Sequence, residues 1–381
     1  MVKSNTAYVR AKNFAEVFNL EIPIILSPMA GVCPVSLSAA VANAGGMGSC
    51  GTLLMKPKDI LDWVKEMRKM SNGAFQLNTW IPDPEPVRDK THEKIVREFL
   101  SKWGPKVPEL PETLPLQDFI GQCQAMLKAS PPVISSIMGL YPSEFVSCMK
   151  DNNIKWFATV TTVTEAKEAE QAGADVIVAQ GMEAGGHRGS FIADNADEKM
   201  IGLFSLIPAV VDAVKVPVIA AGGIADGRGM SAALLLGASA VQIGTGFFRS
   251  PEAKLPKVWS KQLDNSLPED TIATRAFSGR LGRSLRTKYA EAANSKDTPS
   301  PAPYPIQRYL TQEMRTNAIK SNTLEGMQAW AGQSAKLALN LSASEIVLKI
   351  WNDTKQICFN SCVTKESLLE PCIREEDDTF Y

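Results

Sequence analysis

The sequence has almost no net charge, and this excludes one class of partner. Its 381 residues include 40 Lys and Arg against 41 Asp and Glu, a formal net charge of −1 at pH 7. A nucleic-acid-binding protein needs a basic surface that neutralises phosphates, and single-strand binders add aromatic side chains on which bases stack. Neither pattern is present in the chain, so we expect no nucleic-acid partner.

Long apolar runs are also missing. No segment reaches the roughly 18 uninterrupted apolar residues that indicate a membrane-spanning helix. The first residues, MVKSNTAYVRAKNFAEVF, lack the apolar core of a secretory signal. We therefore expect an intracellular, cytoplasmic protein with no membrane partner. Because no acidic residue precedes Glu16, a mitochondrial presequence stays open.

Histidine is scarce and the cysteines are scattered. There are two histidines, His92 and His187, and seven cysteines. An odd number of widely spaced cysteines does not indicate a disulfide framework. Cys358 and Cys362 are four residues apart, but no second Cys or His pair lies near them, as a zinc site would require. We predict no metal site.

Eight short apolar runs alternate with helical patterns at a spacing of about 25 residues, which is typical of βα units around a parallel sheet. The expected strands are Ile22–Pro28, Met47–Cys50, Ala74–Leu77, Val133–Met138, Trp156–Val160, Asp175–Ala179, Pro217–Ala221 and Ala240–Ile243. The expected helices are Val35–Ala44, Pro57–Lys69, Gln117–Ala129, Ser143–Asn152, Thr164–Ala172, Ser205–Val214 and Gly227–Leu236. Thr164 and Asp226 are the expected N-caps of two of these helices, and Gly173 and Gly237 end them.

Several of these runs are apolar without alternation, as in VPVIAAGGI. Such strands belong to sheets that are covered on both faces. We therefore predict an α/β fold, a (β/α)8 TIM barrel with a second, smaller, mainly helical capping domain. A doubly wound open sheet is the alternative, but no G-x-G-x-x-G follows a first strand to support it.

Two stretches interrupt the βα rhythm. Residues 81–115 are rich in proline and charge, which indicates a surface excursion with one helix near Lys94–Lys102 and with His92 in solvent. After Arg249 the pattern becomes polar and helical. We assign residues 20–253 and about 328–350 to the barrel, 254–327 to a cap over its mouth, and 351–381 to a C-terminal extension.

Glycine-rich loops follow the last two predicted strands, at Ala221–Ile224 and Gln242–Gly246. In TIM barrels the loops after strands seven and eight often bind phosphate, because glycines let backbone N–H groups approach an anion. The Thr245 hydroxyl adds a donor. We expect Gly222, Gly223, Gly244 and Thr245 to hold a phosphate-bearing ligand.

Other strand ends supply groups suited to a flat heterocyclic ring. Ser-Pro-Met-Ala-Gly (27–31) follows the first strand, while Asn78 and Gln180 follow the third and sixth. Small residues suit close approach of a ring, and side-chain amides can donate to or accept from its heteroatoms. Together with the phosphate loops, these residues describe a site for flavin mononucleotide (FMN).

His187 lies in the loop QGMEAGGHRG (180–189), directly after the sixth predicted strand. An unperturbed imidazole titrates near neutrality, so His187 can serve as a general base. The alternative is that it only hydrogen-bonds a loop carbonyl. Gly185 and Gly186 leave room beside it for cofactor and substrate.

The strings PIILSPMAGV, FQLN, AQGMEAGGHRG, VIAAGGIADGRG, AVQIGTGF and AWAGQSA, in this order, resemble the nitronate monooxygenase family, formerly called 2-nitropropane dioxygenases. The resemblance covers most of residues 20–340. It implies non-covalently bound FMN in a TIM barrel, and oxidation of alkyl nitronates and nitroalkanes by O2 to carbonyl compounds and nitrite. By the same resemblance His187 is the catalytic base. The implied flavin contacts are Met29, Ala30, Gly31, Asn78, Gln180, Gly185, Gly223, Gln242, Ile243, Gly244 and Thr245.

The chain must also supply a group that meets the negative charge of a nitronate. Candidates for meeting the charge of the substrate are Arg188, Gln333, Ser334 and Lys336. The barrel strings also resemble FMN-dependent NAD(P)H oxidoreductases, such as enoyl-thioester or quinone reductases, and these are the main alternative function. A third hypothesis is a non-catalytic flavin- or phosphate-binding barrel that serves as a sensor. The chain is expected to be a monomer or a homodimer.

Overall fold

A computed structural model describes residues 7–358. Eight parallel strands form a barrel in the order β1-β9-β8-β6-β5-β4-β3-β2. A parallel bridge between Ile25 and Met47 connects the two end strands and closes the ring. The strands are β1 (Ile24–Leu26), β2 (Gly48–Gly51), β3 (Phe75–Trp80), β4 (Val133–Ile137), β5 (Lys155–Val160), β6 (Val176–Gln180), β8 (Val218–Ala221) and β9 (Ala240–Ile243). All eight expected strands are present, and the predicted TIM barrel is confirmed.

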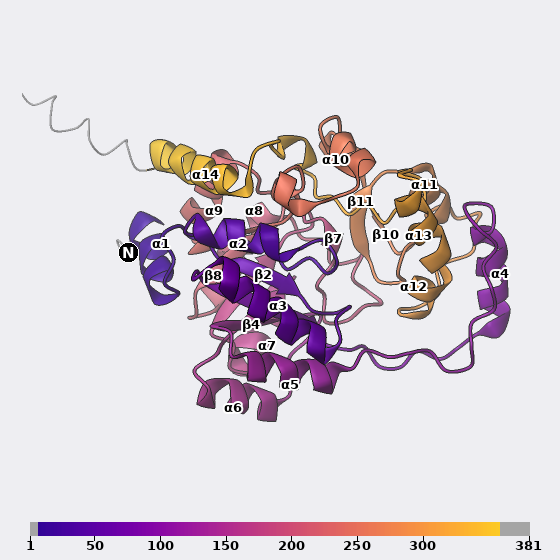
Figure 1. The fold of residues 1–381 in the computed structure, drawn as a ribbon, viewed down its shortest axis with the longest axis horizontal. Coiled ribbons are helices and arrows are strands. Elements are labelled where there is room, and N and C mark those ends of the chain that lie inside the picture. The colour runs from indigo at the N-terminus through magenta and orange to yellow at the C-terminus, as the bar shows by residue number, and fades with distance from the viewer. Residues whose placement is uncertain (1–6, 359–381) are drawn as a thin grey trace, which may run out of the picture.

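Helices surround this barrel, as the ribbon shows (Figure 1). They are α2 (Val35–Asn43), α3 (Pro57–Met70), α5 (Phe119–Ala129), α6 (Ser143–Asp151), α7 (Val163–Gln171), α8 (Leu203–Ala213) and α9 (Gly227–Leu235). Each lies within two residues of its expected bounds. The Asp226 carboxylate accepts from Gly229 N at 3.0 Å, as expected of an N-cap. The cap of α7 is Thr162, which accepts from Glu165 N, so the assignment of this role to Thr164 was wrong.

An additional helix, α1 (Ala7–Val17), closes one end of the barrel. The rings of Phe14 and Phe18 pack with Phe157 of β5, the last two with ring centroids 5.0 Å apart. These residues belong to one buried cluster with Ile25 and other residues of the strands. The barrel is therefore filled and sealed at this end, and its other end, where the strands finish, is left for the site.

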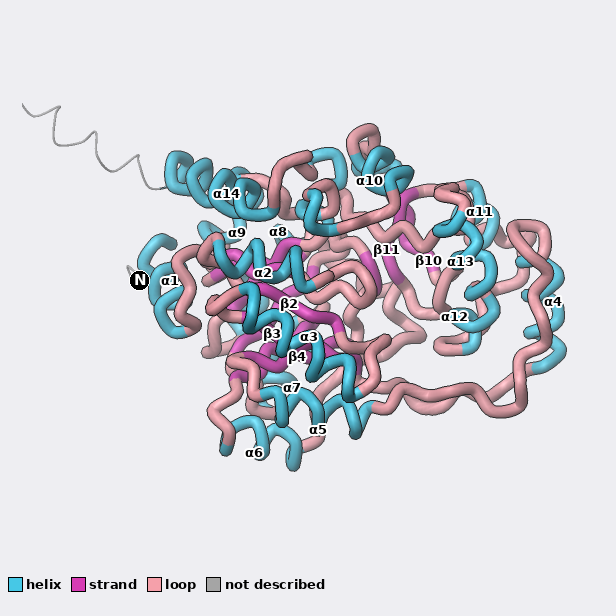
Figure 2. Tube along the Cα trace, in the orientation of Figure 1, coloured by secondary structure: helices cyan, strands magenta, loops and turns pink. Residues whose placement is uncertain are grey.

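The cap contains strands as well as helices. Its elements are α10 (Lys257–Leu263), β10 (Thr271–Thr274), β11 (Gly282–Leu285), α11 (Lys288–Ala293), α12 (Ile306–Leu310) and α13 (Gln312–Lys320). Strand β11 lies between β10 and β7 (Gly186–His187) in an antiparallel sheet. The loop after β6 thus supplies one strand of the cap sheet. Figure 2 shows strands β10 and β11 beside the cap helices, whereas the sequence had predicted a mainly helical cap.

The excursion after β3 runs to the far side of the cap (Figure 1). Its helix α4 (Lys90–Leu100) starts four residues before the expected position. Val96 and Leu100 are buried in one cluster with Phe277, Tyr289 and other cap residues. The segment therefore contributes to the apolar core of the cap, whereas the sequence had suggested only a surface excursion.

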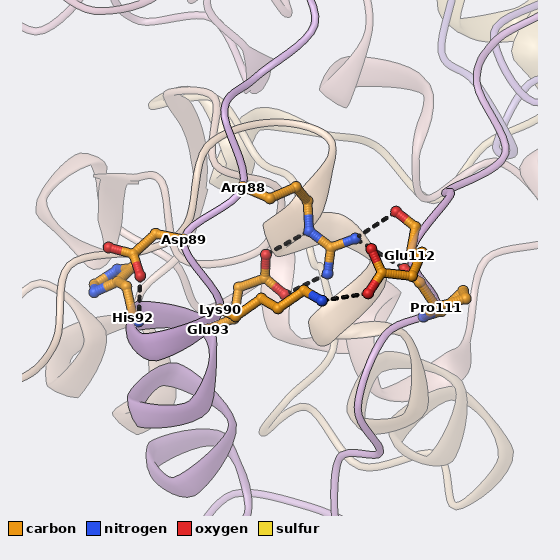
Figure 3. Close-up of polar contacts among 7 residues, drawn as sticks. All are labelled: Arg88, Asp89, Lys90, His92, Glu93, Pro111 and Glu112. Atoms are coloured by element: carbon orange, nitrogen blue, oxygen red, sulfur yellow. Dashed lines mark hydrogen bonds and ion pairs between the residues drawn. The ribbon is translucent and has the colours of Figure 1, made fainter.

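Arg88 joins the two arms of this excursion (Figure 3). Its guanidinium makes two hydrogen bonds to Glu93 and donates to the carbonyls of Pro111 and Glu112. His92 lies beside this network and is half-buried, with Nε2 2.8 Å from Ser300 O. Since a carbonyl only accepts, His92 donates this bond. The side chain is therefore only partly in solvent, where the sequence had placed it entirely.

The last described helix, α14 (Ala343–Cys358), crosses the predicted boundary at residue 350. Ile346, Val347 and Ile350 pack into a barrel cluster, and Thr354 is also buried. The C-terminal extension therefore begins inside a helix of the barrel, and Cys362 lies outside the described residues. Of the helices within residues 7–358, none is long and apolar enough to cross a membrane.

Candidate active site

A cavity of about 340 Å³ opens where the strands end, between the barrel and the cap. Its size and mixed lining are typical of a small-molecule or cofactor site. Residues from the ends of β3, β6, β8 and β9 meet cap residues around it. The sequence-predicted residues on its wall are Met29, Ala30, Gly31, Asn78, Gln180, Gly185, Gly186, His187, Gly222, Gly223, Gln242, Gly244, Thr245 and Ser334.

Four of the predicted contacts lie elsewhere. The Ile243 side chain is buried in the packing between the barrel and its helices, and Gln333 and Lys336 are not part of the cavity wall. Lys336 is exposed in the short 3₁₀ helix η4 (Ala335–Leu337).

Arg188 is buried and turned away from the cavity. Its guanidinium donates to the carbonyls of Gln180 at 2.6 Å, Thr161 at 3.3 Å and Lys199 at 3.1 Å. Burial lowers the pKa of this guanidinium to about 10, which leaves it charged at neutral pH. Arg188 thus holds three backbone segments together, and the expectation that it meets the substrate was wrong.

The glycine loops after β8 and β9 present free backbone donors. Neither Gly223 nor Gly244 donates its N–H to another backbone group among the described residues. Gly222 and Gly223 have φ of +115° and +66°, which favours glycine. A Cβ on Gly222 would lie 3.0 Å from Ala184 N. The loops therefore form a cradle that could hold an anion, and Thr245, in the 3₁₀ helix η1 (Thr245–Phe247), lies beside it.

Two chain segments brace this cradle from the cap side. The Ser334 hydroxyl donates to Gly223 O at 2.5 Å, and Thr245 Oγ1 accepts from Gly332 N at 3.0 Å. The Thr245 hydroxyl hydrogen stays available for a ligand, since an accepted bond does not use it. Ser334 therefore positions the anion loop, a role that its prediction as a substrate contact did not include.

The amide side chains on the wall are oriented by protein partners. Asn78 Nδ2 donates to Ser135 Oγ at 3.0 Å, and Gln242 Oε1 accepts from Gln76 Nε2 at 3.2 Å. These bonds leave the Asn78 carbonyl to accept and the Gln242 amide nitrogen to donate. A ring that carries both donors and acceptors can pair with both groups.

His187 is fixed by both the barrel and the cap. It pairs with Gly282 of β11, and its carbonyl accepts from Gln180 Nε2 at 3.0 Å. The second amide atom of Gln180 accepts from Gly189 N at 2.8 Å. Gln180 therefore uses one N–H and one carbonyl lone pair on the histidine loop, and its second N–H is left for a ligand.

The imidazole lies between two indoles. Its ring centroid is 4.7 Å from those of Trp80 and Trp330, in edge-on contacts. Burial, and then the charges of Arg280, Arg308 and Arg315, lower the pKa of His187 to about 3. The ring is therefore neutral at physiological pH, as a group that accepts a proton has to be.

Ser278 selects between the two neutral forms of this ring. His187 Nε2 lies 2.7 Å from Ser278 Oγ, and the Ser278 hydroxyl also lies 3.3 Å from Arg280 O. When the hydroxyl donates to this carbonyl, Nε2–H of His187 donates to Oγ. In that tautomer Nδ1 is the free acceptor.

The sequence did not single out Trp80, Ser278, Arg308 or Arg315, although all lie at the cavity or against His187. Trp330 belongs to the quoted string AWAGQSA, but no role was given to it. The other residues lie at a strand end or in cap segments whose position over the barrel follows from no local pattern. Only the folded cap brings them to the site.

Solved structures identify the class. The chain is similar to nitroalkane oxidase from Streptomyces ansochromogenes, with a TM-score of 0.83 and 32% identity over 90% of this chain and 98% of that one. It is also similar to FabK from Thermotoga maritima, with a TM-score of 0.70 and 28% identity over 91% and 96% of the two chains. The fold and the site define a TIM-barrel oxidoreductase.

The sequence relatives identify the family within this class. The family model described as nitronate monooxygenase matches residues 12–353. A probable nitronate monooxygenase of Staphylococcus aureus (strain MSSA476) is 36% identical over 348 residues, which are 90% of this chain and 97% of the relative. The protein belongs to the nitronate monooxygenase family, a family of flavin-dependent oxidoreductases.

Proposed function

We propose that this protein binds FMN without a covalent bond and oxidises alkyl nitronates, and more slowly nitroalkanes, with O2 to carbonyl compounds and nitrite. The observation that carries the proposal is the neutral imidazole of His187 on the wall of a cavity that is also lined by the glycine loops after β8 and β9. Membership of the family supports it.

The residues fit FMN. The N–H groups of Gly223 and Gly244 and the Thr245 hydroxyl would hold the phosphate, while Asn78, Gln242 and the remaining N–H of Gln180 would meet the ring. FMN, when bound, accepts electrons from the substrate and passes them to O2, which is the chemistry of the cofactor. The residues of the chain supply binding, orientation and proton handling.

His187 handles the proton. Nδ1 would accept the proton from the α carbon of a nitroalkane, and Ser278 and the edges of Trp80 and Trp330 keep the ring in one orientation. A protonated ring is costly here because of burial and the neighbouring arginines. Substrates that arrive already deprotonated avoid this cost, and we therefore expect nitronates to react faster than neutral nitroalkanes.

The test is oxygen uptake and nitrite release with 1-nitropropane and with its nitronate. Wild type should consume O2 with both and faster with the nitronate, whereas His187→Asn should keep its flavin and lose turnover of the neutral compound. Unchanged turnover of 1-nitropropane by His187→Asn would refute the role as base. If wild type consumes no O2 with 1-nitropropane and none with its nitronate, the proposed function is refuted.

The alternative, an FMN-dependent NAD(P)H oxidoreductase, needs one further measurement. Under anaerobic conditions NADH should reduce the flavin slowly in a nitronate oxidase and quickly in a reductase. Rapid bleaching of the flavin absorbance by NADH or NADPH, without nitronate turnover, would favour the reductase.

A further inference from the structure

The cap wall of the cavity carries two positive charges and no negative one. Arg308 of α12 and Arg315 of α13 line it, and its lining residues include no Asp, Glu or Lys. The anion cradle for a cofactor phosphate comes from different elements, the loops after β8 and β9. The two arginines are therefore an additional feature of the cavity, with no role in the cradle.

Arg308 has no polar partner within the described part of the chain. It is half-buried, and its guanidinium makes none of the hydrogen bonds or ion pairs found among residues 7–358. A guanidinium has five N–H donors in a planar fork. All five are directed to solvent or to whatever fills the cavity.

Arg315, in contrast, is held in place by three hydrogen bonds. Its guanidinium donates to Thr311 Oγ1 at 3.1 Å, to Gln328 Oε1 at 3.1 Å and to Arg308 O at 2.7 Å. Burial and the charge of Arg308 lower the pKa of Arg315 to about 10, so it stays charged at neutral pH. All three acceptors are uncharged, and none neutralises the guanidinium.

This arrangement is electrostatically incomplete. Two like charges near each other destabilise the cap, and both also lower the pKa of His187. Partly buried cations are normally paired, because an unpaired buried charge is costly. A negatively charged group in the cavity would offset both effects at once.

We propose that Arg308 and Arg315 form a subsite for a planar, two-oxygen anion carried by the substrate. A guanidinium fork matches such a group with two parallel hydrogen bonds. Nitronate and carboxylate groups share this shape and charge. The assignment of the anion to an oxidisable substrate depends on the proposed function, whereas the existence of the subsite does not.

Binding of a non-reacting anion to the flavin-loaded enzyme tests the subsite. Butyrate has nearly the shape of 1-nitropropane nitronate and cannot be oxidised at the site, and butyramide is its neutral counterpart. Butyrate should perturb the flavin absorbance with saturation, and Arg308→Gln should weaken its binding by at least about tenfold, as expected for loss of a hydrogen bond to a charged group. Butyramide should bind weakly and equally to both proteins.

The matched control is Lys320→Gln, which removes one charge from an exposed position at the end of α13, away from the cavity. Lys320 is not part of the cavity wall, although Ile319 beside it is, so this variant should leave butyrate binding unchanged. Arg308→Lys keeps the charge without the planar fork and should bind butyrate at an intermediate level. Equal butyrate affinity of wild type and Arg308→Gln, with the flavin bound in both, would overturn the proposal.

Two substrates distinguish the source of the anion. If the subsite holds the nitronate group, Arg308→Gln should raise KM for 1-nitropropane nitronate and for the nitronate of 3-nitropropionate by the same factor. If the subsite holds a separate carboxylate, Arg308→Gln should raise KM only for the nitronate of 3-nitropropionate. An unchanged KM for both would refute the subsite, whereas Arg308-dependent butyrate binding without turnover of any nitronate would keep the subsite and refute the proposed function.

Discussion

His187 Nε2 lies 2.7 Å from Ser278 Oγ, so a residue of the cap orients the histidine that the barrel presents. The two residues are 91 positions apart in the chain. The β7–β11 pairing also joins the backbone of the same histidine to the cap. The cap thus fixes the orientation of this histidine as well as covering the cavity.

Ser278→Ala should lower turnover of 1-nitropropane about tenfold and leave turnover of its nitronate nearly unchanged, because an oriented general base contributes only to the step that removes a proton. KM should change little. Ser278→Thr, which retains the hydroxyl, should restore most of the rate. An equal loss with both substrates would indicate a general structural defect in place of a positioning role.

The depressed pKa of His187 predicts a pH dependence of stability. In the unfolded chain the histidine binds a proton below pH about 6.5, whereas in the folded protein it does so only below about 3. Between these values the unfolded state binds more protons, so stability falls as the pH is lowered, by up to about 1.4 kcal/mol per pH unit from this group.

Urea unfolding of wild type and His187→Asn between pH 7 and 4 measures this effect. The difference in unfolding free energy between the two proteins should shift in favour of the variant as the pH falls. A difference that is constant over this range would show that the imidazole is not held neutral.

Gly222→Ala should weaken flavin retention. Gly222 has φ of +115°, and an added Cβ would press on Ala184 N at 3.0 Å, so the anion loop would have to move. Measurement of flavin absorbance per protein after gel filtration gives the result. Gly229→Ala, in α9, is the control, because its Cβ would meet only ordinary contacts at 3.5 Å or more, with Ile224 and Asp226. This variant should retain full flavin.

Asp83→Asn should destabilise the cap. The guanidinium of Arg280 is almost completely buried, and it donates to both carboxylate oxygens of Asp83 and to Ser190 O. Removal of one partner of a buried pair leaves an uncompensated charge, at a cost of about 3 kcal/mol.

Thermal or denaturant unfolding tests this, with Lys90→Ala as the comparison. Lys90 pairs with Glu112, and both side chains are largely exposed, so its loss should cost less than about 1 kcal/mol. Similar losses of unfolding free energy in Asp83→Asn and Lys90→Ala would show that the Arg280–Asp83 pair does not stabilise the cap.

The local pattern of apolar residues along the chain was sufficient to predict the barrel. Runs such as Pro217–Ala221 are apolar on both faces, and a buried parallel strand is the structure that uses such runs. Helix ends such as Asp226 and Gly237 depend on neighbours only a few residues away, and therefore appear in the sequence. The N-cap at Thr162 was misplaced by two residues because Thr164 offers the same hydroxyl.

The sequence also predicted that the glycine loops and the strand-end amides lie together at one end of the barrel. Once eight parallel strands are assigned, their carboxyl ends necessarily meet, so Asn78, Gln180 and Gly223 had to face one cavity. The sequence could not show the direction of each side chain. Arg188 follows His187 directly, yet it is buried against three carbonyls on the other side of the loop.

By itself, the sequence therefore determined the βα repeat, the glycine cradle and the presence of one histidine at the mouth, because these depend on short-range periodicity and on residue type. Only the tertiary structure decided what surrounds that histidine. Ser278, Trp330, Arg308 and Arg315 reach the cavity because the excursion, the cap sheet and the cap helices pack over the barrel. Contacts between residues about 100 positions apart leave no periodic trace in the chain, and these contacts set the charge of the imidazole.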